Sequence, residues 1–156
     1  MNKVAQLMCS ALVTGTVASV VSTTALASLA KAEGKRASRP TNSTSHWLHG
    51  ENAGSYQGID VAHTGVGLAT HHASALFWAL PFEAWLALSP PRSSTELLLK
   101  AAGMSTIAAA VDYGIAPKRL TPGWELTLSK AAIGAAFASL AIGLAAGAIV
   151  SKNLRS

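Results

Sequence analysis

The residues most capable of chemistry in this chain are its five histidines, which all lie between positions 46 and 72. His63 and His71 are eight residues apart, which places both on one face of a helix together with Gly67. His72 follows about 100° round the same helix. Imidazole titrates near neutral pH and is the commonest metal ligand, so this helix is the first place to look for function.

Three interpretations of these helix histidines remain open. The favoured one is neutral hydrogen bonding to Ser or Thr of a neighbouring helix, or to the carbonyl that Pro81 frees. The second is a proton or cation pathway through His71, His72, Asp60 and Asp112. The third is a haem or metal site in a redox subunit. A bis-histidine haem needs ligands from two facing helices, so only a homodimer could complete it here.

A second polar group precedes this helix. His46 and His49 have the i, i+3 spacing that could hold a divalent ion with Glu51, but HxxH without further ligands is a weak metal pattern. Asp60 is expected to cap the start of the helix, although it could also pair with His63 at i, i+3. We therefore predict no cofactor and no metal site, and His46, His49, Asp60 and His63 join His71 and His72 as the polar candidates.

The remaining acidic residues favour structural roles. Glu83 lies between two tryptophans and is expected at the membrane interface rather than buried as an acid. Asp112 is expected to form an ion pair with the basic turn at 118–119, and Glu96 and Lys100 form an i, i+4 pair. The chain has no GxSxG, Walker loop, GxGxxG or HExxH, which predicts a protein that is not an enzyme.

Composition places these residues in a membrane protein. Half of the 156 residues are apolar and only 12% are charged, far below the usual share in a water-soluble domain. The net charge of +5 could indicate nucleic acid. The basic residues flank apolar stretches instead, as topology signals do, so we expect a lipid bilayer and no nucleic acid as partner. The single cysteine, Cys9, excludes a disulfide framework within the chain.

The apolar stretches predict one membrane domain, an all-α polytopic transmembrane helical bundle of about four spans. The predicted spans are residues 4–30, 60–88, 97–115 and 126–150, with a polar loop at 31–59. The first stretch could also be a cleaved signal peptide with a cleavage site at 25–27. Its length and the basic residues that follow favour a retained helix. Pro81 is expected to kink the second span.

Small residues recur at every fourth position of the last span and predict close helix packing. They are Ala131, Ala135, Ser139, Gly143 and Gly147. Packing within the monomer is the favoured interpretation, and a homo-oligomer through this fourth helix is the alternative. The positive-inside rule mildly favours a cytoplasmic location for the loops at 31–59 and 116–125.

Three runs of the sequence resemble a family of small, uncharacterised proteobacterial inner-membrane proteins. They are SHWLHGE at 45–51, HHASALFWA at 71–79 and DYGIAPKRLTPG at 112–123. The likeness covers about residues 46–147, and the paired histidines before Phe-Trp are its most distinctive part. The resemblance implies a four-helix fold and a multi-pass location in the bacterial inner membrane, and it implies no activity.

Overall fold

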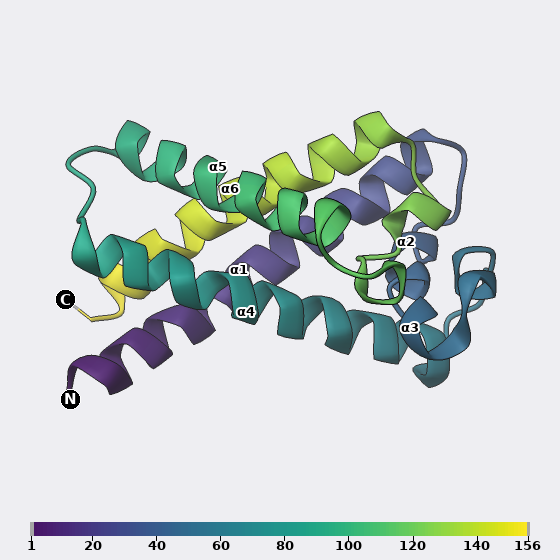
Figure 1. Cartoon of the computed structure of the whole chain (residues 1–156), viewed down its shortest axis with the longest axis horizontal. Coiled ribbons are helices and arrows are strands. Elements are labelled where there is room, and N and C mark those ends of the chain that lie inside the picture. Colours follow the sequence, from purple (N-terminus) through teal and green to yellow (C-terminus); the bar gives the residue numbers. More distant parts are fainter. Residues whose placement is uncertain (1, 156) are drawn as a thin grey trace.

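The computed structural model describes residues 2–155, which are 79% helical and contain no strand. Four helices are long, and they alternate in direction along the chain. They are α1 (Lys3–Ala32), α4 (Val66–Leu88), α5 (Ser94–Gly114) and α6 (Lys130–Asn153). Both termini and the α4–α5 turn therefore meet at one end of the bundle (Figure 1). The predicted all-α fold is confirmed.

The opposite end carries a folded cap in place of the expected polar loop at 31–59. Three short helices occupy that segment: α2 (Arg39–Ser43), α3 (His46–His49) and η1 (Glu51–Gly54). Pro40 stands in the first turn of α2, where its missing N–H costs nothing, and Gly50 ends α3 with φ at 72°. The short helices η3 (Lys118–Leu120) and η4 (Trp124–Leu126) join the cap from the α5–α6 connection. The prediction of an unstructured loop is wrong, because these helices are too short to show a hydrophobic period.

The helix ends follow their capping residues. Asp60 precedes a π-helical turn, η2 (Val61–Gly65), that leads into α4, and its carboxylate accepts the His63 N–H at 2.7 Å. The predicted cap is confirmed. Ser129 caps α6, so this helix begins four residues later than the predicted span. α4 continues as α-helix through Pro81 to Leu88.

Two of the long helices, α1 and α6, have the length and hydropathy needed to cross a membrane. The other two do not meet these conditions. α4 contains the histidine pair and Glu83, and α5 contains Glu96, Lys100 and Asp112. On hydropathy alone, four spans are therefore not established, and the crossing of α4 and α5 has to be argued from their surfaces.

α1 lies between α6 and α4 and contacts both over much of its length (Figure 1). A Cβ added at Gly147 of α6 would lie 2.6 Å from the Thr14 Cα, and one at Gly143 would lie 2.7 Å from the Ala18 Cα. On the other side of α1, a Cβ at Gly15 would lie 2.8 Å from the Leu76 Cα. These distances are below van der Waals contact, so only glycine permits the two helix pairs to approach this closely.

The small-residue stripe on α6 is an interface only in its second half. Gly143 and Gly147 are buried against α1, which confirms packing within the monomer, whereas Ala131 and Ala135 are exposed and Ser139 is half-buried. A repeat of four residues advances about 400° on a helix, so each step drifts about 40° around the axis. The expectation that all five share one face is wrong for that reason. The buried positions nearer the start of α6 are instead Ala132, Ala136 and Leu140.

The Gly147 contact gives a stability prediction with an internal control. We expect Gly147→Ala to destabilise the protein by about 1–3 kcal/mol, because the added methyl group meets backbone that cannot move aside. Gly134 of the same helix is exposed and has no atom within 4 Å of an added Cβ. We expect Gly134→Ala to stabilise by about 0.5–1 kcal/mol through helix propensity. Thermal unfolding in detergent measures both; equal effects would contradict the packing.

Candidate functional site: buried polar groups around α4

His71 is the most buried histidine on α4 and forms a hydrogen bond to α1. Its Nε2 lies 2.9 Å from the Ser22 Oγ, and the Ser22 hydroxyl donates to the Ala18 carbonyl at 2.7 Å. A hydroxyl has one proton, so with that proton on the carbonyl its oxygen accepts from His71. The ring nitrogen must then carry hydrogen. This contact is the neutral interhelical bond that the sequence favoured.

A second hydrogen bond joins the same two helices further along. The Thr14 Oγ1 of α1 donates to a Glu83 carboxylate oxygen at 2.5 Å, and Glu83 is only 6% exposed. Glu83 is therefore buried against α1, where the hydroxyl gives the carboxylate a partner inside the bundle. The two bonds pair the antiparallel helices in order, Thr14 with Glu83 and Ser22 with His71.

A small cavity of about 100 Å³ lies beside His71. Its lining includes Asp112 of α5, Trp124 of η4 and the hydroxyls of Thr70 and Ser74. The Trp124 Nε1 is buried and has no hydrogen-bond partner within residues 2–155. A water molecule takes about 30 Å³ of liquid volume, so the cavity has room for a few waters and polar groups to hold them. His71 and Asp112 thus line one small cavity from two helices, and most of its remaining surface is apolar.

Two sequence candidates do not take their expected places. His72 is half-buried and lies outside the lining of this cavity. Asp112 forms no ion pair with the 118–119 turn, so that prediction is wrong. Arg119 instead donates from Nε to the Trp47 carbonyl at 2.9 Å, because the chain after α5 turns toward α3 and carries the basic pair away. The Glu96–Lys100 pair is confirmed at 3.5 Å.

The other candidates form a polar cluster outside the four long helices. The ring of His63 stacks between His49 and Tyr56, with centroid distances of 4.4 and 3.9 Å. Asp60 accepts the Tyr56 hydroxyl at 2.6 Å and lies 3.2 Å from the His63 Nδ1. The Tyr56 hydroxyl, followed by the His63 backbone N–H, lowers the pKa of Asp60 to about 2. Asp60 is thus a fixed anion that holds the entry to α4.

The remaining cap histidines bond to backbone rather than to each other. The ring nitrogens of His46 lie 3.1 Å from the Ser43 carbonyl and 3.0 Å from the Lys118 carbonyl. The His49 Nε2 lies 2.8 Å from the Ala62 carbonyl. Within residues 2–155, no three His, Cys, Asp or Glu side chains are placed to hold a metal ion. The two histidines of this HxxH motif therefore join α3 to the backbone of neighbouring segments.

Sequence reasoning missed the partners of these groups. Ser10, Thr14, Ala18 and Ser22 recur every fourth residue on α1, and that repeat was the available signal for a polar, closely packed face. Trp124 follows a Pro-Gly turn, and nothing in its neighbours indicates that its ring reaches His71, at a centroid distance of 5.7 Å.

Comparison with known proteins gives no further assignment. No protein-family model, no curated protein and no solved structure matches this chain. The kinship with small proteobacterial inner-membrane proteins therefore stays a prediction from the three sequence runs.

The Ser22–His71 bond can be tested by a double-mutant cycle. We expect Ser22→Ala and His71→Ala to be coupled by about 0.6 kcal/mol, and by no more than about 1.7, as for other hydrogen bonds between membrane helices. Unfolding free energies of both single variants and the double variant give the coupling. Ser28 is the matched control, since it is exposed and donates only to the Thr24 carbonyl of its own helix. A coupling of Ser28→Ala with His71→Ala as large as that of Ser22→Ala would contradict the contact.

Proposed function

We propose that this chain is a multi-pass integral protein of the bacterial inner membrane, with α1, α4, α5 and α6 all crossing the bilayer. We further propose a structural or accessory role and no enzymatic activity. The observation that carries the membrane part is the distribution of side chains on the long helices, where large apolar side chains lie on the outer surface and hydroxyl groups are among the buried ones.

This distribution of apolar and hydroxyl side chains is clearest on α1. Its buried face carries hydroxyl groups, including Ser10, Thr14 and Ser22, which are at most 1% exposed. Its outer face carries Val4 and Val20, which are 69% and 62% exposed. Water would leave these apolar side chains unfavourably solvated, whereas lipid would surround them at no cost. The buried hydroxyls bond to backbone and to α4, as lipid requires of polar groups.

The outer faces of α4 and α5 support the same proposal. Phe77 of α4 is 65% exposed and Leu99 of α5 is 67% exposed. With 23 and 21 residues, these helices are about 34 and 31 Å long, which matches a hydrocarbon core of about 30 Å. The Lys100 ammonium donates to the Ser89 carbonyl at 2.7 Å. Ser89 lies in the α4–α5 turn, so the Lys100 side chain places its charge near the helix end rather than at the middle of the bilayer.

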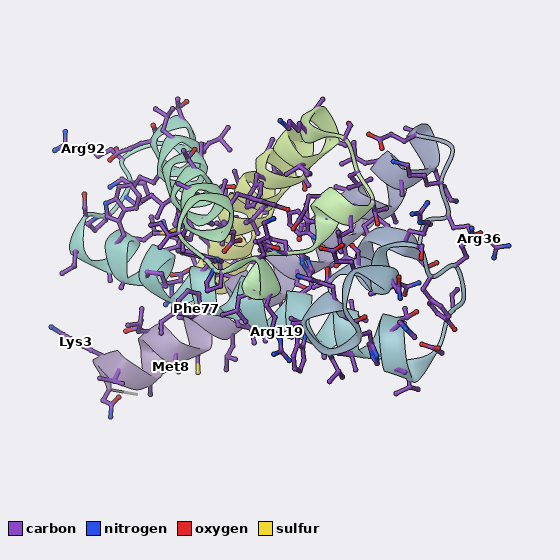
Figure 2. All side chains as sticks on the ribbon, turned by 45° about the vertical axis from the view of Figure 1, so that its right-hand side comes forward. Lys3, Met8, Arg36, Phe77, Arg92 and Arg119 are labelled. Carbon is purple, nitrogen blue, oxygen red and sulfur yellow. The ribbon has the colours of Figure 1, made fainter. Side chains whose placement is uncertain are left out.

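Basic side chains lie toward the two ends of the bundle. Figure 2 shows Lys3 and Arg92 at one end and Arg36 at the other, with Met8 and Phe77 on the sides between them. This layout suits lipid headgroups at both ends and hydrocarbon between them. The hydrogen-bonded states of His71 and Glu83 support a structural role, since each has a partner on α1.

Membrane integration has a direct test. Expressed in bacteria, the protein is expected to remain with the membranes after an alkaline carbonate wash and to require detergent for release. Apolar surface on all four helices accounts for that behaviour. A folded, monodisperse protein in the supernatant of a detergent-free lysate would contradict the proposal.

The cavity beside His71 favours one further candidate, a small permease for protons or a metal cation. His71 and Asp112 are titratable groups from two helices, and they line one cavity with room for water. Such a chain of groups at membrane depth is how proton relays are built. The permease candidate requires the purified protein to conduct protons or cations across a membrane, and the structural role does not.

Proton flux into liposomes separates the two. The permease candidate predicts a flux above that of protein-free liposomes, abolished by Asp112→Asn and by His71→Ala. Asp60→Asn is the matched control, because it removes a carboxylate outside the cavity and should leave the flux unchanged. A flux equal to that of protein-free liposomes would reject the permease and leave the structural role.

A further inference from the structure

A large cleft opens at the end of the bundle where the two termini meet. Its volume is about 860 Å³, within the range of sites that bind small molecules. α1, α4, the α4–α5 turn, α5 and α6 all contribute to its walls. Nothing in the structural or permease proposals uses this space.

Four basic side chains converge on the cleft from separate parts of the chain. Lys3 comes from α1, Arg92 from the α4–α5 turn, Lys152 from α6 and Arg155 from the segment after α6. Arg155 donates to the Ser10 hydroxyl, which holds the end of the chain against α1. The fold thus brings together cations that are far apart in the sequence.

Few carboxylates oppose these cations; the nearest on the rim is Glu96, which accepts the Arg92 backbone N–H at 2.8 Å and also acts on Arg92 electrostatically. Within residues 2–155 the ion pairs are Lys35–Glu33, His63–Asp60 and Lys100–Glu96, and none of them involves a cleft cation. The lining contains one carboxylate, Glu83, which accepts a hydrogen bond from Thr14, against the four cations. The cleft therefore carries positive charge that is available to a ligand.

Part of the cleft wall is apolar. Leu86 of α4, Leu97 of α5 and Ile149 of α6 contribute to it, beside the basic rim. A ligand that satisfies both parts has an anionic group at one end and hydrocarbon at the other. A free phosphate ion would meet the cations but leave the apolar wall exposed to water.

We propose that this cleft binds the headgroup of an anionic phospholipid, with its phosphate among the four cations and its first acyl carbons against the apolar wall. Guanidinium groups match phosphate oxygens in a bidentate fashion, and basic pockets between membrane helices favour anionic headgroups. The inference rests on the proposed membrane crossing, because the cleft lies at the level of the helix ends, where headgroups begin.

Thermal unfolding of the full chain in a neutral detergent tests the proposal. The probes are short-chain phosphatidylglycerol, phosphatidylcholine with the same acyl chains, and inorganic phosphate. We expect phosphatidylglycerol to raise the unfolding midpoint by several degrees more than phosphatidylcholine does, since a ligand that binds only the folded state stabilises it. Inorganic phosphate should give no comparable shift.

Paired variants locate the effect. Arg92→Gln with Lys152→Gln removes two cleft cations and should reduce the phosphatidylglycerol shift to the phosphatidylcholine level. Arg36→Gln with Lys31→Gln removes an exposed arginine and lysine at the opposite end and should retain the shift. The midpoint of each variant in phosphatidylcholine reports its intrinsic stability, so a folding defect is recognised separately.

Three outcomes would overturn the proposal: equal shifts with both lipids, a full shift with inorganic phosphate alone, or equal losses in the two paired variants. Any of these in a protein that resists the carbonate wash would remove the lipid site and leave the membrane crossing intact. Release by that wash would instead remove the membrane crossing on which the site depends.

Discussion

The close approach of α1 to both α6 and α4 is the constraint on which the rest of the molecule depends. Gly147 and Gly143 let α6 reach the α1 backbone, and Gly15 lets α4 reach it from the other side. Thr14 belongs to both contacts, because its Cα faces Gly147 and its hydroxyl reaches Glu83. Larger residues at these positions would separate the helices and break the hydrogen bonds that depend on a short interaxial distance.

This packing explains how polar groups are accommodated in an apolar chain. In the proposed membrane, lipid would give the helices no hydrophobic reason to associate, so small residues and interhelical hydrogen bonds would hold them together. His71 and Glu83 each meet a hydroxyl of α1, and the charge of Lys100 is directed to the α4–α5 turn. Within residues 2–155, the buried side-chain polar atoms without a hydrogen-bond partner are the Trp124 Nε1, beside the small cavity, and the Thr23 hydroxyl.

Features that depend on local chemistry could be predicted from the sequence. Apolar length predicted the long helices to within a few residues, Asp60 was predicted as a cap, and the GxxxG at 143–147 was predicted to pack within the monomer. Features that depend on which helix is the neighbour were not predictable from the pattern. The hydrogen bond of Glu83 is an example, because its partner on α1 is 69 residues away in the chain. The cap helices were not predicted, because four or five residues are too few to show a hydrophobic periodicity.

The central claim is that α4 and α5 cross the membrane together with α1 and α6, and side-specific cysteine labelling tests it most directly. In a Cys9→Ser background, single cysteines at Arg36 and Arg92 report the two ends of the bundle that Figure 2 shows. Four spans predict that a membrane-impermeant maleimide labels these two positions from opposite sides. Labelling of both from the same side would contradict the account, because α4 would then not cross the bilayer.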